Sequence, residues 1–264
     1  METIYRAALM GAGGATLGVG VSWLVARLLR RRPQWLPLIP AGFATFLVAM
    51  TRPADPPPSA VMETLDKAPA FHALKTYYPD DYRRMEAEVL RARSKQQVLA
   101  ASGAALGAVI VRERVKADPE TAYALYEVAR DEGRALRTVD ARACAAFRDG
   151  KGDGGRLGPL MTPAMIDKDQ QATARLFAQT SATPATPAAA MPMETLLQLS
   201  VEALRTLPEP EQDPAILVLR EMRDPRTADE AKATCDFDLA LADAILSRPK
   251  PLGGALVRAL WAMK

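Results

Sequence analysis

Two uncharged, mostly apolar stretches fill the first fifty residues of the chain. Ala7 to Ala26 holds 20 residues without a charge, and Pro33 to Thr51 holds 19 more. At a rise of about 1.5 Å per residue, a helix of either length matches the hydrocarbon core of a bilayer, which is about 30 Å thick. We therefore predict that residues 1–52 form a two-helix transmembrane hairpin. The alternative is a buried helical pair in a soluble core.

The first stretch is not typical of a cleaved signal peptide, because it ends in arginines and lacks an A-x-A cleavage pattern. It contains Gly14 and Gly18 in a GxxxG spacing. Small residues at this spacing let two helices approach closely. The motif predicts packing of the first span against the second. Association with a second copy, or with a larger membrane complex, is the alternative.

Arginines between the two stretches predict the orientation of the hairpin. The outer flanks carry only Arg6 and Arg52, whereas the short loop between the spans is strongly basic. Under the positive-inside rule this loop lies in the cytoplasm. Everything after Arg52 then lies on the far side of the membrane, which in a bacterium is the periplasm. The residues that set this topology are Arg27, Arg30, Arg31 and Arg32.

Residues 53–59 are rich in proline and predict a stiff, extended spacer. Beyond them no run alternates convincingly between apolar and polar positions, as a half-buried strand would. We therefore predict an all-α protein, with a helical domain at 60–264 that contains an Ala/Pro-rich loop at 180–192. The expected helices lie near 60–67, 69–78, 80–115, 119–148, 163–179, 193–207, 214–223, 228–247 and 252–263.

Capping signals locate several helix starts within this domain. An Asp or Thr before a proline places a capping side chain next to a residue suited to the first helical position. The chain has this form at Asp118-Pro119, Thr162-Pro163, Asp213-Pro214 and Asp224-Pro225, while Thr227 to Glu230 matches a capping box.

The stretch from Gln96 to Val111 allows a different topology, because its 16 residues carry no charge. Apolar runs of this length are more often buried core helices than membrane spans. We therefore predict a core helix at 96–111. A third span is the alternative, and it would return the C-terminal part of the chain to the cytoplasm.

The net charge of +3 is unevenly distributed along the chain. Residues 1–52 carry six arginines and one glutamate, a net charge of +5, so the remainder carries −2. A slightly acidic domain argues against a nucleic-acid partner. The sequence also contains no asparagine, which excludes N-glycosylation.

Cys144 and Cys235 are the only cysteines, and His72 is the only histidine. In an oxidising periplasm two cysteines of one domain commonly pair, so we predict a disulfide between them. Two free buried thiols are the alternative. One histidine and two distant cysteines provide neither a C-x-x-C motif nor the ligands of a zinc site, so we expect no metal and no cofactor.

Paired acids offer the remaining candidate chemistry. Asp80-Asp81 and Asp229-Glu230 are better explained as acids that favour a helix start. For Asp236, Asp238 and Asp243 we expect a solvated helix face. The glycine-rich segment 150–158 lacks the spacing of a phosphate-binding loop and follows no predicted strand.

No catalytic constellation stands out, so we lean against an enzyme and the catalytic residues stay unknown. The leading hypothesis is a membrane-anchored helical protein with an interaction, scaffold or accessory-subunit role in the cell envelope. Its expected partners are the lipid bilayer and either another protein or a second copy. The alternatives are an envelope enzyme with carboxylate-based chemistry and an oligomeric, transport-related membrane protein.

Overall fold

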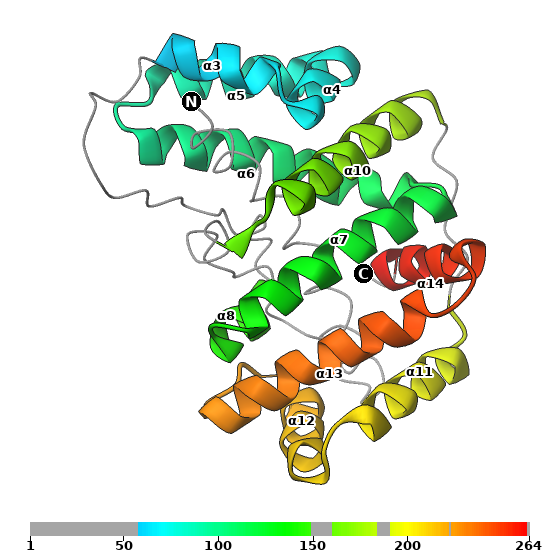
Figure 1. The fold of residues 1–264 in the computed structure, drawn as a ribbon. Helices are drawn as coiled ribbons and strands as arrows, with labels where there is room; N and C mark the ends of the chain where they lie inside the picture. Colours follow the sequence, from blue (N-terminus) through cyan, green and yellow to red (C-terminus); the bar gives the residue numbers. More distant parts are fainter. Residues whose placement is uncertain (1–57, 149–159, 184–190, 222, 263–264) are drawn as a thin grey trace.

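The computed structural model describes residues 58–148, 160–183, 191–221 and 223–262. Within these ranges every regular element is a helix, which confirms the all-α prediction (Figure 1). The helices are α3 (Pro58–Asp66), α4 (Pro69–Tyr77), α5 (Pro79–Arg91), α6 (Lys95–Glu113), the 3-10 helix η1 (Arg114–Lys116), α7 (Pro119–Arg137), α8 (Ala141–Arg148), α10 (Pro163–Ala182), α11 (Met193–Thr206), α12 (Glu209–Glu221), α13 (Ala228–Leu246) and α14 (Lys250–Ala262).

Several predicted features lie outside the described residues. The transmembrane hairpin at 1–52 does, together with Gly14, Gly18 and the four arginines from Arg27 to Arg32. The glycine-rich segment at 150–158 lies there too. Residues 58 and 59 of the predicted spacer already belong to α3, and α10 continues to Ala182, so it includes the first three residues of the predicted Ala/Pro-rich loop.

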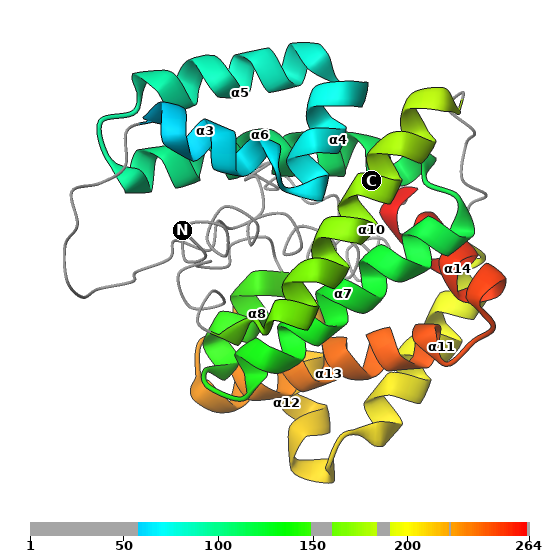
Figure 2. The same ribbon diagram turned by 45° about the horizontal axis from the view of Figure 1, so that its top comes forward.

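Helix α7 occupies the centre of the fold (Figure 1). It packs against α10 on one side and against α13 and α14 on the other. Helices α3 to α6 gather at one end, where α4 contacts α10, and α11 and α12 lie against α13 at the opposite end (Figure 2). A single cluster of buried apolar side chains runs through the described helices from α3 to α14.

The apolar periodicity of α7 explains its central position. Buried residues recur at intervals of three or four along the helix, including Leu125, Ala129 and Leu136, so one broad face is turned inward. Large rings from its neighbours fill the core, including Phe177 of α10 and Trp261 of α14. Burial of such faces is the main favourable term in folding, because it removes apolar surface from water.

Three of the predicted caps are confirmed. The side chains of Asp118, Thr162 and Thr227 accept hydrogen bonds from backbone N–H groups three residues further on, at the starts of α7, α10 and α13. Two predicted caps are wrong. Helix α12 begins at Glu209, so Pro214 lies inside it, and Asp224-Pro225 lies between α12 and α13.

Two predicted long helices are each divided in two. The expected helix at 80–115 breaks before Ser94, whose side chain caps α6 by accepting from the N–H of Gln97. The expected helix at 119–148 breaks before Asp140, whose carboxylate accepts from the N–H groups of Arg142 and Ala143 at the start of α8. In both places a polar side chain satisfies backbone donors that a continuous helix would have bonded internally.

The uncharged stretch at 96–111 forms most of α6. Leu106, Val109 and Ile110 of this helix are buried in the shared core. Across the described ranges, no helix combines the length and the hydropathy that a membrane span requires.

Candidate functional site

The two cysteines meet, as the sequence predicts. Cys144 of α8 and Cys235 of α13 lie at disulfide distance, with their Cα atoms 5.7 Å apart across 91 residues of sequence. Both side chains are buried. His72 lies on α4 with an exposed side chain, and no nucleophile–base pair joins it to either cysteine.

Most of the acids that the sequence singles out are dispersed among separate ion pairs. Asp81 accepts from Arg112 at 2.9 Å, and Asp236 accepts from Arg137 at 2.6 Å and 2.9 Å. Glu230 accepts from both terminal nitrogens of Arg223, at 2.7 Å and 2.6 Å, next to its capping role. Asp238 is buried, at 3% exposure, so the expectation of a solvated face is wrong for this residue.

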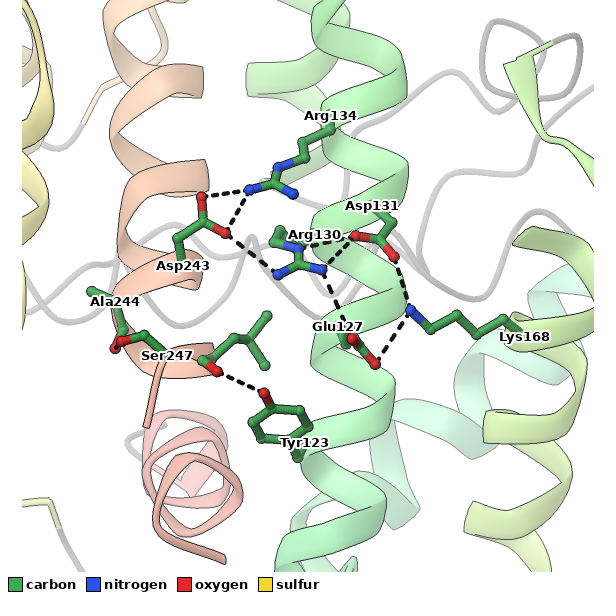
Figure 3. Close-up of polar contacts among 10 residues, drawn as sticks. Tyr123, Glu127, Arg130, Asp131, Arg134, Lys168, Asp243, Ala244 and Ser247 are labelled. Carbon is green, nitrogen blue, oxygen red and sulfur yellow. Dashed lines mark hydrogen bonds and ion pairs between the residues drawn. The ribbon is translucent and has the colours of Figure 1, made fainter. Parts of the chain in front are cut away.

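A network of charged side chains joins α10 to α7 on the surface (Figure 3). Lys168 of α10 donates to Asp131 of α7 at 2.9 Å and forms an ion pair with Glu127 at 3.2 Å. Asp131 also accepts from Arg130 at 2.7 Å. Burial raises the pKa of the Asp131 carboxyl group, but the ammonium group of Lys168 and the guanidinium group of Arg130 together outweigh burial. The pKa is therefore lowered.

The same network continues from α7 to α13. Asp243 accepts from Arg134 at 2.7 Å and from Arg130 at 3.4 Å (Figure 3). Nearby, the hydroxyl of Tyr123 donates to the backbone carbonyl of Leu246 at 2.6 Å. All of these charges have partners and are partly exposed. We therefore interpret this charged network as ion pairs that bridge three helices, and not as a reactive centre.

Two buried acids, which the sequence analysis missed, directly follow residues of this charged network in the chain. They are Glu132 of α7, next to Asp131, and Asp169 of α10, next to Lys168. Glu132 is 0% exposed and Asp169 is 2% exposed. Among the described residues, neither oxygen of Glu132 has a hydrogen-bond partner, and Oδ2 of Asp169 lacks one as well. Buried carboxyl groups are normally hydrogen-bonded or paired with a cation, so this pair is the most unusual polar feature of the described core.

The environment of these two acids favours their neutral forms. Burial raises the pKa of Asp169 to about 7, against a smaller lowering by the amide of Gln170. Burial also raises the pKa of Glu132 well above its usual value, and the negative charges of Asp169 and Asp131 raise it further. The pair therefore holds protons at a pH where exposed carboxyl groups are ionised.

Glu113, by contrast, is a buried acid whose negative charge is paired with cations. It is 2% exposed, but its oxygens accept from Arg112 at 2.7 Å and from Lys116 at 2.9 Å. Burial opposes its ionisation, and these hydrogen bonds outweigh the burial, so its pKa is lowered. Among the described residues no cation is paired with Glu132 or Asp169, and the contrast supports their assignment as neutral groups.

The buried acids do not form an accessible active site. A general acid or a carboxylate nucleophile must reach its substrate within hydrogen-bond distance, and both acids are enclosed by α7, α10 and their neighbours. No group of three or more His, Cys, Asp and Glu side chains within the described residues could hold a metal ion.

Described residues of the C-terminal half line two of the surface grooves. One, of about 530 Å³, lies between α12 and the start of α13, where Ile216 is exposed. The other, of about 750 Å³, follows α11 and is lined by Leu197 and Val201 with charged neighbours. Both side chains are 42% exposed, although Leu and Val are usually inside. The outer face of α11 is therefore the strongest candidate for a contact with another molecule.

The chain was compared with protein-family models, with curated proteins and with solved structures, and none of them matches it.

Proposed function

We propose that this protein is a membrane-anchored interaction protein, with a scaffold or accessory-subunit role in a complex of the cell envelope. The observation that carries the proposal is the outer face of α11, where Leu197 and Val201 lie side by side, exposed and one turn apart. Exposed apolar side chains that share a groove and are flanked by charges are typical of protein contact sites.

The location that we propose is the inner membrane, with the helical domain on the periplasmic side. The two uncharged stretches in residues 1–52 and the basic loop between them support this placement. The proximity of Cys144 and Cys235 agrees with it, because disulfides persist in oxidising compartments and are rare in the cytosol.

Site-directed photo-crosslinking in intact cells tests this function. A photoreactive residue at Gln198, which is exposed between Leu197 and Val201, is expected to yield a crosslinked product of defined mass. The same residue at Glu88, exposed on α5 at the opposite end of the fold, is the control and is expected to yield none.

A second variant makes the result specific to the apolar face. Leu197→Arg places a charge within the contact and is expected to abolish the product from position 198, because an unpaired charge at an interface is costly to desolvate. If position 198 gave no product, or a product that Leu197→Arg left unchanged, α11 would not be the contact surface and the proposal would fail.

A further inference from the structure

Helix α11 carries a straight stripe of four side chains on its outward face. Glu194, Leu197, Val201 and Arg205 follow one another at steps of three, four and four residues, which keeps them on one side of a helix. All four are exposed. The stripe therefore has an acid at the N-terminal end, two apolar side chains in the middle and a base at the C-terminal end.

The opposite face of α11 already has its partner. Leu196, Leu199 and Ala203 are buried, and the helix packs on α13 with a smaller contact to α12. The inward contact is therefore complete without Leu197 and Val201. These two apolar side chains have no role in the described core.

The charges at the two ends of the stripe also lack partners within the described domain. Neither Glu194 nor Arg205 forms an ion pair with another described residue, whereas neighbouring Glu202 pairs with Arg248 of the α13–α14 turn. The helix dipole favours an acid near the first turn and a base near the last, and this alone stabilises α11 modestly. It does not explain why the apolar pair between them is left in solvent.

Two copies of this stripe that run in opposite directions are complementary, because the acid of each lies opposite the base of the other. In an antiparallel pair of α11 helices, Glu194 meets Arg205 of the partner subunit, and Arg205 meets the partner's Glu194. The midpoint between residues 194 and 205 differs from that between 197 and 201 by half a residue, or about 0.75 Å along the axis. One two-fold axis therefore aligns both ion pairs and sets Leu197 against the partner's Val201.

We propose that α11 binds α11 of a second copy of this chain in an antiparallel arrangement. A parallel arrangement would set acid against acid and base against base, which is repulsive. The isologous geometry is that of the commonest homodimers, in which the same patch serves both subunits. The inference deepens the proposed function and rests on it, since it names the partner of the same surface.

A single helix pair buries less than the roughly 1,200 Å² of a standard stable interface. The association is therefore weak in dilute solution. A shared membrane confines two anchored copies and raises their effective concentration, which favours dimers without any new contact. The experiment consequently uses the full chain in its own membrane.

Cysteine crosslinking detects the arrangement directly. Gln198→Cys adds a thiol close to the proposed two-fold axis, while the two native cysteines are bonded to each other. In membranes, a short bismaleimide is expected to join two copies through residue 198. Glu194→Arg and Arg205→Glu, each added to this background, are expected to reduce the crosslinked dimer by at least about fivefold, because each turns both ion pairs into repulsions.

Two recombinations test whether opposite charges meet across the pair, and the second also tests the antiparallel order, because a parallel pair of doubly substituted chains would again set like charges together. Coexpression of the Glu194→Arg and Arg205→Glu chains is expected to restore the dimer as a mixed species, because every charge then meets its opposite. The chain with both substitutions is expected to restore it as well. Since these samples contain the same substitutions, their recovery also excludes misfolding as the cause of the loss.

Crosslinking that ignored the single substitutions, or that the doubly substituted chain failed to restore, would overturn the antiparallel dimer. A different result separates this inference from the proposed function. If residue 198 crosslinked only to a protein of another mass, the interaction role would stand and the second copy would be excluded as its partner.

Discussion

Gly254 of α14 lies directly against the backbone carbonyl of Pro119, the first residue of α7. A Cβ atom placed on Gly254 would overlap that carbonyl group, and backbone atoms cannot move aside as a flexible side chain can. Gly253 lies nearly as close to the carbonyl oxygen of Ile245, which a Cβ atom would approach to 2.9 Å. Gly254 thus allows α14 to cross the start of the central helix at close range, and Gly253 allows it to lie close to the end of α13.

Gly254→Ala is therefore expected to lower the free energy of unfolding by about 3 kcal/mol, the upper part of the usual range for overpacking. A loss of stability would be informative, because helix propensity alone favours alanine over glycine by about 1 kcal/mol and would predict a gain. Chemical denaturation of the purified protein measures the change. Leu252→Ala, on the same helix at a 52% exposed position, is the control and is expected to change stability by less than about 0.5 kcal/mol. An unchanged Gly254→Ala protein would mean that α14 can shift away from α7.

The sequence predicted where polar residues mark helix starts, and its failures have local causes. Asp118, Thr162 and Thr227 cap the helices that they were expected to cap. The break at Ser94 was missed although Ser94 and Gln97 have the sequence spacing of a capping box. Ser94 accepts from the N–H of Gln97, and Gln97 accepts from the N–H of Arg93, the residue before the cap. The continuous helical periodicity on both sides of the break concealed this signal.

The buried acids show a different limit of sequence analysis. Periodicity places Glu132 on the same face as Leu125, Val128 and Leu136, so its position within the core face could have been recognised. What the sequence could not supply is the opposing helix. The cations of Glu113 are its neighbours in sequence, Arg112 and Lys116. Glu132 instead meets Asp169, an acid of another helix, and only the packing of α10 against α7 brings these two together.

Loss of the Cys144–Cys235 link is expected to destabilise the described domain strongly. The two residues are 91 apart in sequence, and closing a loop of this size contributes about 4–5 kcal/mol in the chain-entropy model. The double variant Cys144→Ser/Cys235→Ser, followed by thermal unfolding, measures the loss. The reduced wild-type protein is the control and should unfold at nearly the same temperature as the double variant. A reductant that left the wild-type melting temperature unchanged would contradict the pairing.

Stability is expected to fall as the pH rises from about 4 to about 7, because the folded state holds a proton on Asp169 that the unfolded chain releases. The pKa of this carboxyl is 3.8 when unperturbed and about 7 when folded. A raised carboxyl pKa gives stability that is complete below the unfolded value and is lost as the pH passes the folded value. The difference corresponds to a loss on the order of 4 kcal/mol, to which Glu132 adds in the same direction.

Asp169→Asn isolates this effect, because an amide of nearly the same shape carries no titratable proton. The variant is expected to match the wild type near pH 4 and to exceed its stability near pH 8. Asp167→Asn removes an exposed carboxyl on the same helix and should leave the wild-type pH profile intact. Denaturation midpoints of the wild type and both variants, measured between pH 4 and pH 8, give the pH profiles to be compared. Coincident profiles for Asp169→Asn and the wild type would show that the buried pair does not titrate in this range.

The proposed topology predicts which thiols a membrane-impermeant maleimide reaches in intact cells. Ser181 is exposed at the C-terminal end of α10, so Ser181→Cys is expected to be labelled from the periplasm while the native cysteines stay bonded. Leu29→Cys, within the arginine-rich loop, is expected to be labelled only after the cells are permeabilised, because the positive-inside rule places this loop in the cytoplasm. The reverse pattern would show that the arginine-based orientation is inverted. If Ser181→Cys were protected, the helical domain would lie in the cytosol, where disulfides rarely persist. An oxidising compartment would then no longer explain the pairing of the two cysteines.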